Sequence, residues 1–596
     1  MSPFRCLPFA LAVLPVLAGV PFSIVRGVSS LPERWPAMRQ VLEHNHAATD
    51  EIWFSTGCDF PVMAWHRQNA ANQAAVADEV RALGILPSLQ VQATIGHGEP
   101  DAVAPRAAHR DWTGFTGPDG REGVVCNCPR DPAFQRYFDE LSRLYAAWRP
   151  ASVWIDDDLR VDRHGCIPTG CYCARCVRTF SEKEGRTWTR EALVRAAVDD
   201  AALAARWRTF CREGLAELAG VIARAFHEVS PETRFGLQYP WADDAQLIVC
   251  RELVRAGGGR KVGLRPGCGA YRDRDPFAQV DKAWRIGRQL KALKGEDLFD
   301  QICPEIENYP RTFATRNANG LAFEALIGLA QGCDSLSWYL LGGPEEPACY
   351  DRALFPALRC NMSLYRGYVE ANRGAEPCGF DVPDLGESTT APDIPAAFAA
   401  TGIPFAPGVG RKIGMVLWRG VLDRMDDDQV RAALKVGAVL TDAAAARELV
   451  RRGLLDAACA RPGRHALPQG RLAVFKSLDP VDASSSDLFA YGADADWATA
   501  RGLHPAIAIT PCLAATYPWT RKDGAFASLV VLNTTIGEQA PVTFRIRRFT
   551  GAHAVWHPLW GEPAVLDVRR DGPMNDALVT LPALGPWSAG FLVPVN

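Results

Sequence analysis

Residues 131–158 read DPAFQRYFDELSRLYAAWRPASVWIDDD, and this stretch predicts one helix followed by one strand. Asp131 is a favourable N-cap residue, and Pro132 suits the first helical position. Apolar residues recur with helical spacing along one face as far as Tyr145. The apolar run SVWI then begins at residue 152. The stretch therefore predicts a helix that packs on a sheet and a buried strand that ends in three aspartates.

The same unit repeats between residues 20 and 345. Short apolar runs alternate with amphipathic helical stretches, which is the pattern of parallel strands connected by helices. Eight units predict a (β/α)8 TIM barrel, with a doubly wound sheet as the competing α/β layout. The expected strands are 22–27, 50–56, 87–93, 152–158, 234–239, 261–266, 299–306 and 334–340, and the clearest helices are 67–83, 131–148, 189–228, 276–294 and 319–331.

The sequence changes in character after residue 374. The stretch CGFDVPDLGEST at 378–389 is rich in Pro, Gly and acidic residues, which is typical of a linker. Further on, short strand patterns alternate with turn residues up to the C-terminus. We therefore expect the barrel at 20–374, a small α/β domain at 375–468 and a C-terminal β-sandwich-like domain at 469–596.

Composition excludes several classes of partner. The formal net charge of -3 gives no indication of nucleic-acid binding, and no apolar run is long enough to cross a membrane. Eighteen cysteines in 596 residues do not fit a small disulfide scaffold. The segment CLPFALAVLPVLAG at 6–19 resembles the apolar part of a signal peptide, but two prolines interrupt it. We expect a cytoplasmic protein, and export through this segment is the alternative.

Acidic residues follow two of the predicted barrel strands. Strand four ends in the aspartates 156–158, and strand seven ends with Glu305 and Glu307. Functional residues of this fold lie at the C-terminal ends of strands. A pair of carboxyl groups can hydrolyse a glycosidic bond, because one protonates the leaving oxygen while the other attacks the anomeric carbon or activates water. The structural alternative is that the aspartates cap the next loop, pair with Arg160 or bind a cation.

Aromatic and polar residues near the other strand ends are candidate substrate-binding residues, since aromatic rings stack on sugars and polar groups bind hydroxyls. A place in the core or the barrel wall is the alternative for each. The candidates are His66, His97, Tyr239, Trp241, Tyr271, Arg272, Tyr309 and Trp338.

Residues 171–176 read CYCARC, a spacing that suits the thiolate ligands of a tetrahedral zinc ion. A fourth ligand is needed, and the cysteine of NCPRDP at 127–132 is the best candidate, with Cys126 and Cys166 as alternatives. Four cysteines leave no open coordination position, so the zinc would be structural. Reduced thiols without a metal are the alternative, and we expect no organic cofactor. The predicted ligands are Cys128, Cys171, Cys173 and Cys176.

The order NCPRDPAFQRYF, VWIDDD and CYCARC resembles the family-42 glycoside hydrolases, known mainly as β-galactosidases. That family has Cys-Pro at the helix before strand four, then Trp-x-x-Asp-Asn-Glu, then Cys-Tyr-Cys-x-x-Cys, which binds zinc in some members. ENYP at 307–310 resembles its Glu-x-x-Pro at the end of strand seven. The resemblance also implies the three-domain order and a homo-oligomer, either a dimer or a trimer.

The resemblance implies roles for individual residues. Glu307 matches the nucleophile, and Asp158 matches the acid/base if one residue is deleted after Trp154. Asp157 then stands where the family has an asparagine that contacts the sugar 2-hydroxyl. Because an ionised aspartate cannot donate a hydrogen bond, galactose specificity is not implied. The reserve candidates are Glu305 for the nucleophile and Asp156 or Asp157 for the acid.

The sequence thus predicts a retaining glycoside hydrolase that acts on a carbohydrate with a β-linkage. Two other functions remain open. One is a metal-dependent barrel hydrolase, with a catalytic cation held by Asp156, Asp158, His97 and His164. The other is a non-catalytic relative that only binds carbohydrate.

Overall fold

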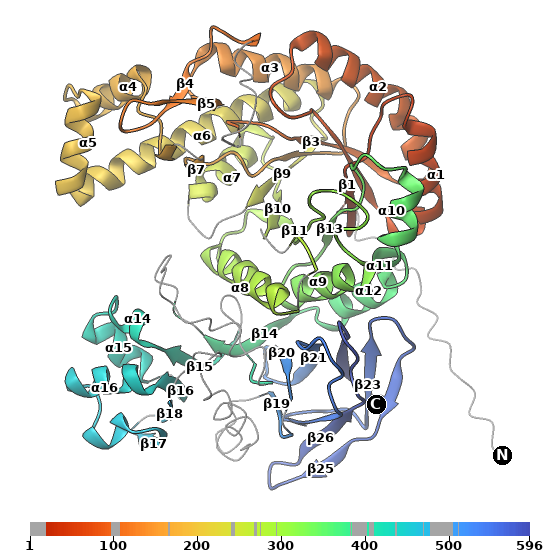
Figure 1. Cartoon of the computed structure of the whole chain (residues 1–596), viewed down its shortest axis with the longest axis vertical. Coiled ribbons are helices and arrows are strands. Elements are labelled where there is room, and N and C mark those ends of the chain that lie inside the picture. Colours follow the sequence, from red (N-terminus) through yellow and green to blue (C-terminus); the bar gives the residue numbers. More distant parts are fainter. Residues whose placement is uncertain are drawn as a thin grey trace.

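The computed structural model describes residues 20–96, 108–164, 167–239, 245–267, 271–273, 276–293, 295–381, 383, 402–404, 411–435, 438–468, 470–476, 505–510 and 512–595. Its N-terminal part forms a barrel surrounded by helices, drawn at the top of Figure 1, with the two further parts of the chain below it. None of the described helices combines the length and the apolar character needed to span a membrane.

Nine strand segments form the parallel sheet of the barrel, in the order β11, β10, β9, β6, β3, β2, β1, β13, β12. β11 and β12 are consecutive pieces of one strand, so the two ends of this order meet and the barrel closes with eight strand positions. This confirms the predicted TIM barrel. The segments are β1 Ser23–Arg26, β2 Glu51–Ser55, β3 Leu86–Val91, β6 Ser152–Ile155, β9 Arg234–Tyr239, β10 Val262–Pro266, β11 Phe299–Ile302, β12 Glu305–Ile306 and β13 Leu336–Tyr339.

Helices follow the strands and cover the outside of the barrel. The predicted cap of α3 is confirmed, since the Asp131 carboxylate accepts a hydrogen bond from the Phe134 backbone N–H at 2.9 Å. The helices are α1 Trp35–Asn45, α2 Met63–Ala82, α3 Pro132–Ala146, α4 Ala174–Glu184, α5 Arg190–Asp199, α6 Ala201–Val229, α7 Ala245–Ala256, α8 Pro276–Ala292, α9 Ala318–Ala330, α10 Pro347–Ala353, α11 Pro356–Arg359 and α12 Met362–Ala371. Short pieces β4 Gly114–Thr116, β5 Glu122–Asn127, β7 Asp162–His164 and β8 Ile167–Thr169 form two hairpins.

Two indole rings fill the centre of the barrel. Trp53 of β2 and Trp154 of β6 stack with their ring centroids 4.8 Å apart. Gly236 of β9 and Gly263 of β10 lie against Trp154, and a Cβ at either position would come within 2.3 and 2.5 Å of its ring atoms. The glycines therefore leave the space that Trp154 occupies, and the residues after Trp154 lie above this apolar floor.

A ten-stranded sheet connects the two parts of the chain that follow the barrel, because β14 pairs in parallel with β15 and antiparallel with β20. The domain limits stay a prediction. β18 begins just after the expected limit at 468 but pairs with β16. The elements of the small α/β part are β14 Ala375–Asp381, β15 Arg411–Leu417, α14 Arg419–Leu422, α15 Asp427–Ala433, β16 Ala438–Asp442, α16 Ala443–Arg451, β17 Gly463–Leu467 and β18 Gly470–Phe475.

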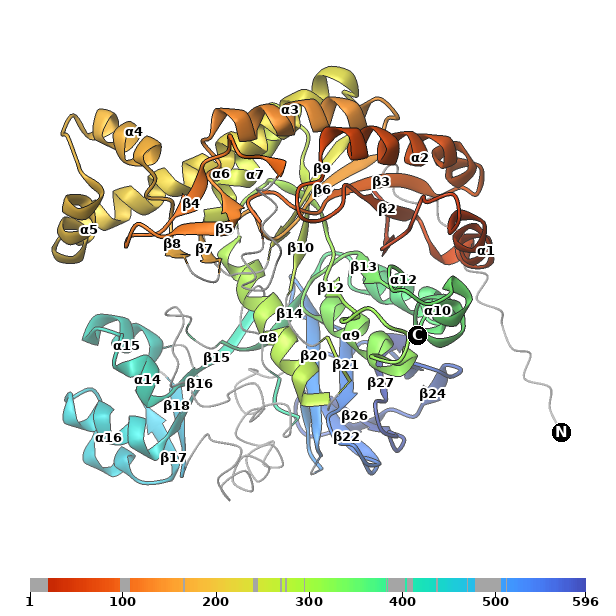
Figure 2. The same cartoon turned by 45° about the horizontal axis from the view of Figure 1, so that its top comes forward.

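The C-terminal part is sandwich-like, as predicted. A four-stranded sheet in the order β19, β22, β26, β25 packs over the end of the large sheet, with an apolar core between them. Figures 1 and 2 both place this part beside α9 and α12, where the Trp519 indole N–H donates to the Ala330 carbonyl at 3.1 Å. The strands are β19 Ala506–Ala508, β20 Ala514–Arg521, β21 Phe526–Asn533, β22 Val542–Ile546, β23 His553–Pro558, β24 Ala564–Leu566, β25 Arg569–Asp571, β26 Asp576–Leu581 and β27 Ala589–Val595.

A Gly236→Ala substitution tests the fit around Trp154. The added methyl group would overlap the indole, and overpacking of this kind costs roughly 1–3 kcal/mol. We expect a matching decrease in the free energy of unfolding, measured by chemical denaturation. Gly367→Ala in α12 is the control, because no atom lies within 4 Å of its added Cβ. Equal stability of the Gly236→Ala variant and the wild type would contradict the tight fit.

Candidate active site at the barrel mouth

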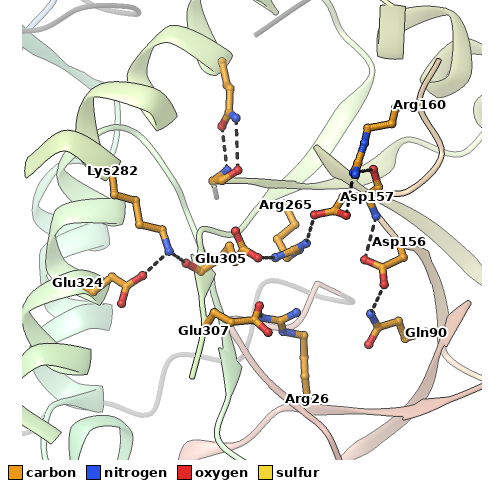
Figure 3. A network of polar contacts seen from close by, with 12 residues as sticks. Arg26, Gln90, Asp156, Asp157, Arg160, Arg265, Lys282, Glu305, Glu307 and Glu324 are labelled. Atoms are coloured by element: carbon orange, nitrogen blue, oxygen red, sulfur yellow. Dashed lines mark hydrogen bonds and ion pairs between the residues drawn. The ribbon is translucent and has the colours of Figure 1, made fainter. Parts of the chain in front are cut away.

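Glu305 and Glu307 lie at the end of strand seven with their side chains directed into the barrel mouth (Figure 3). They are only 3% and 9% exposed. One Glu307 oxygen accepts a hydrogen bond from Arg26 at the end of β1, at 3.1 Å. Glu305 forms an ion pair of 2.7 Å with Arg265 of β10. Each glutamate therefore has an arginine partner from a different strand.

The two glutamates differ in their ionisation. Burial raises the pKa of Glu305, but Arg265 and then Lys282 more than offset this and hold it at about 2. Burial also raises the pKa of Glu307, and the neighbouring Glu305 raises it further against the effect of Arg26. Glu305 is therefore the carboxylate that ionises first, and Glu307 ionises at higher pH.

Asp158 holds the loop after β3 and has no exposed surface. Its carboxylate accepts hydrogen bonds from the backbone N–H groups of Thr94 and Gly96, both at 2.8 Å, and from the Thr94 hydroxyl. The role of Asp158 as the acid stays a prediction, but both of its oxygens already accept hydrogen bonds from the loop after β3. The structural alternative, an aspartate that caps a loop, describes Asp158 better.

Asp156 and Asp157 lie across the mouth from the two glutamates (Figure 3). Asp157 forms ion pairs with Arg160 at 3.3 Å and with Arg265 at 3.7 Å. Asp156 is 8% exposed, and one of its oxygens accepts from the side-chain amide of Gln90 at 3.2 Å. Arg265 thus contacts an acid of strand four and an acid of strand seven.

Three predicted substrate-binding residues, His66, Tyr239 and Trp338, have buried side chains. His66 is buried between α2 and α3, where its ring nitrogens bond the hydroxyls of Tyr137 and Tyr145. Burial lowers the pKa of His66 to about 4. Tyr239 and Trp338 are buried in the apolar core between the barrel and its helices. Their burial favours the structural alternative, a place in the core or the barrel wall, for all three.

Other predicted residues remain candidates. The rings of Tyr271 and Tyr309 are 6.2 Å apart, and Tyr309 is 49% exposed. Arg272, beside Tyr271, is exposed. His97 and Trp241 lie outside the described residues.

Sequence reasoning missed the cationic side of the site. Arg26 ends the apolar run FSIVR, and Arg265 is the penultimate residue of VGLRP. An arginine in a buried strand requires an acidic partner. That requirement was a usable signal for both ion pairs. Arg311 gave no such signal in its loop, yet its guanidinium lies over the Tyr339 ring at 4.9 Å beside the mouth.

The four predicted cysteine ligands meet in one buried cluster with all four sulfur atoms within 4.8 Å of one another. Cys128 Sγ lies 3.5 Å from Cys176 and 3.7 Å from Cys173. Tetrahedral thiolates at the zinc–sulfur distance of about 2.3 Å would be about 3.8 Å apart, so the cluster fits a metal ion. Cys126 instead contacts the Gly96 carbonyl, and Cys166 lies outside the described residues.

No family model and no curated protein matches the chain. Solved structures of similar fold do exist. A GH42 β-galactosidase from G. stearothermophilus aligns with a TM-score of 0.55 at 10% identity, over 97% of this chain and 99% of that chain. A β-galactosidase from Rahnella sp. R3 aligns at 0.53 and 12% identity over 94% and 98% of the two chains. One from Bacillus circulans sp. alkalophilus aligns at 0.52 and 11% over 97% and 99%. The chain therefore has the whole fold of these enzymes.

Two substitutions test the structural role of Asp158. Asp158→Ala leaves two buried backbone N–H groups without an acceptor, so we expect the free energy of unfolding to fall by about 3 kcal/mol. Asp158→Asn should lose much less, because its amide oxygen can accept from both N–H groups. Chemical denaturation measures both changes. A small effect of the alanine variant would contradict the role of Asp158 in the β3 loop.

Proposed function

We propose that this protein is a retaining glycoside hydrolase that acts on a β-linked glycoside or oligosaccharide with two carboxyl groups. The observation that carries the proposal is the buried Glu307, held by Arg26 at the barrel mouth across from the aspartates of strand four. The fold shared with β-galactosidases supports a sugar substrate. Galactose itself is not part of the proposal.

Glu307 is the nucleophile in this proposal. Arg26 binds one carboxylate oxygen, and Glu307 keeps more exposed surface than Glu305. Glu305 is drawn to Arg265 on its side of the mouth. The role of Glu305 is therefore to neutralise the positive charge of Arg265, which also contacts Asp157.

Asp156 takes the acid role in place of Asp158. It lies two residues after Trp154, whose indole fills the barrel centre, and so it is directed to the same side. Its partner Gln90 can donate to an ionised carboxylate and accept from a protonated one, which an acid/base needs. Asp157 is instead engaged by two arginines.

The reaction then follows two steps. Asp156 protonates the glycosidic oxygen while Glu307 attacks the anomeric carbon, which releases the first product and leaves a glycosyl ester on Glu307. Asp156 next removes a proton from water, which attacks the same carbon and releases the sugar with retained configuration. Tyr271, Tyr309 and Arg272 are the proposed sugar contacts among the described residues.

The cysteine cluster would hold a structural zinc ion. Four thiolates fill the tetrahedral coordination of zinc, so the ion would stabilise the loops without joining the reaction. No organic cofactor takes part in the proposed chemistry. A homo-oligomer, either a dimer or a trimer, stays a prediction from the family resemblance.

The two other candidate functions have less support. Among the residues that the structure describes, the group that fits a metal ion is the cysteine cluster, away from the mouth. Asp158, needed for a catalytic cation, is engaged by Thr94 and Gly96. A non-catalytic carbohydrate-binding protein would not need Glu307 to be held by Arg26.

A panel of chromogenic β-glycosides tests the catalytic roles. We expect Glu307→Gln to abolish turnover and Asp156→Asn to lower kcat/KM by roughly 10²–10⁴-fold. Asp158→Asn should keep most of the activity and serves as the matched control on the same strand end. NMR of the first-formed product anomer should show retention.

Several results would contradict these roles. Unchanged turnover of Glu307→Gln would remove it as the nucleophile, and selective loss in Asp158→Asn would return the acid role to Asp158. Turnover that mild chelation abolishes, with the cysteine-bound metal retained, would favour a metal-dependent hydrolase. Sugar binding without turnover, equal in the wild type and Glu307→Gln, would identify a binding protein.

Elemental analysis tests the metal proposal. We expect one zinc ion per chain in the wild type, and its loss in Cys173→Ser together with a lower Tm, because the ion connects two loops. Cys126→Ser is the control, since this thiol lies outside the cluster. At temperatures below unfolding, kcat should be unchanged by zinc loss if the ion is structural. A metal-free wild type would contradict the proposal.

A further inference from the structure

Strand seven is broken at the place where it carries the two glutamates. β11 pairs with β10 up to Ile302, and Pro304 has no backbone N–H to continue that ladder. β12 is aligned only with β13, through Glu305 and Ile306, in the pairings of the described strands. The side of Glu305 that faces β10 therefore needs other hydrogen-bond partners.

Side chains from α8 occupy this gap. Lys282 donates its Nζ to the backbone carbonyl of Glu305. Gln289, on the same helix, accepts from the Gly267 backbone N–H at 2.8 Å where β10 ends. Arg316, in the segment before α9, donates to the backbone carbonyl of Glu307 at 2.8 Å. Two cations thus hold the main chain on either side of Ile306.

One buried carboxylate connects these two cations. Glu324 of α9 binds Lys282 through one oxygen and Arg316 through the other, the latter at 2.7 Å. Arg316 also pairs with Asp273 at 2.7 Å. Lys282, Arg316 and Glu324 are almost fully buried. The four charges cancel, and every group has a partner.

Holding two carbonyl groups with buried charges costs desolvation free energy. Desolvation of buried charges often offsets their attraction, and a ladder of backbone hydrogen bonds would satisfy the same carbonyls without burying any charge. The network differs from a ladder in one respect, because it places fixed charges behind Glu305 and Glu307. Lys282 is one of the cations that lower the pKa of Glu305.

We propose that Lys282, Arg316 and Glu324 are positioning residues that fix Glu305 and Glu307 through the backbone carbonyls of the broken strand. The kinetic consequences rest on the proposed function. The positioning itself concerns only the place and charge of the two glutamates. The charged and titratable groups that face these glutamates are Arg26 on β1, Asp156 and Asp157 after β6, Arg265 on β10, Lys282 on α8, Arg311 and Arg316 after β12, Glu324 on α9 and Tyr339 on β13.

Two substitutions of opposite charge provide the test. Lys282→Met removes a positive charge from behind both glutamates, which makes the ionised form of the nucleophile Glu307 less stable. The acidic limb of the kcat/KM profile, which reports the ionisation of Glu307, should therefore move to higher pH. Glu324→Gln removes one negative charge and leaves the network with a net positive charge, because Asp273 still pairs with Arg316. A net positive charge favours ionised glutamates, so the same limb should move to lower pH. Both variants should lose kcat by roughly 10–100-fold with a smaller change in KM, because the displaced group is catalytic. Lys282→Arg keeps the positive charge, so its kcat should be higher than that of Lys282→Met.

Glu448→Gln is the matched control. Glu448 is 5% exposed and likewise binds several cations, Arg419 at 3.0 Å and Arg451 among them, but it lies on α16 in the small α/β part. This variant should lower Tm without changing kcat or the pH profile. Shifts of the acidic limb in the same direction for Lys282→Met and Glu324→Gln, or no shift in either, would overturn the positioning role.

A second measurement separates this proposal from the proposed function. Carbon-13 NMR of labelled glutamate side chains can follow the titration of Glu307, identified by its absence in Glu307→Gln. Opposite shifts in Lys282→Met and Glu324→Gln would support the positioning role even in a protein that hydrolyses no glycoside. Unshifted titration in an active enzyme would reject the positioning role and leave the glycosidase proposal intact.

Discussion

Glu305 and Glu307 alternate with Ile306 on one strand, so their two carboxyl groups enter the same buried opening. Charges this close raise each other's energy unless cations lie beside them. The cations come from both directions around the barrel, Arg265 from β10 and Arg26 from β1. Because β1 follows β13 in the closed sheet, the pair with Arg26 can form only when the barrel is complete. Barrel closure and the charged mouth therefore depend on each other.

The floor beneath this mouth explains how strongly the charges interact. Trp53, Trp154 and Cys303 form a small apolar cluster inside the barrel, and they exclude water from below the acids. Electrostatic interactions in such a place are stronger than at a surface. Below this apolar cluster lie polar groups again. Glu51 accepts hydrogen bonds there from the Trp53 indole N–H at 2.8 Å and from the Ser152 hydroxyl at 2.6 Å. The interior is thus layered, and only its upper layer opens toward a ligand.

Periodicity predicted the barrel, its strands and its helices, because these features depend on short stretches of sequence. It did not predict which strand residues face inward. Tyr239 and Trp338 lie at strand ends, but both faces of a strand in a covered parallel barrel are apolar, so composition cannot separate them. Asp158 was matched to the acid/base through the family resemblance, and a motif match does not show that both of its oxygens bind the loop after β3. The cysteine spacing predicted the cluster because three of its four cysteines lie within six residues.

The cysteine cluster and the acids of strand four belong to one segment of chain. Cys128 stands just before α3, and Cys171, Cys173 and Cys176 follow β6, so the cluster closes a loop that contains α3, β6 and the aspartates at 156–158. A metal ion bound by the four cysteines would close this loop and remove conformational freedom from the unfolded chain. Strand seven has no comparable closure, and its main chain is held instead by buried side chains from α8 and α9. The two sides of the mouth are therefore held by different means. One is held beside a buried cluster of four cysteine side chains that fits a metal ion, and the other is held by buried charges.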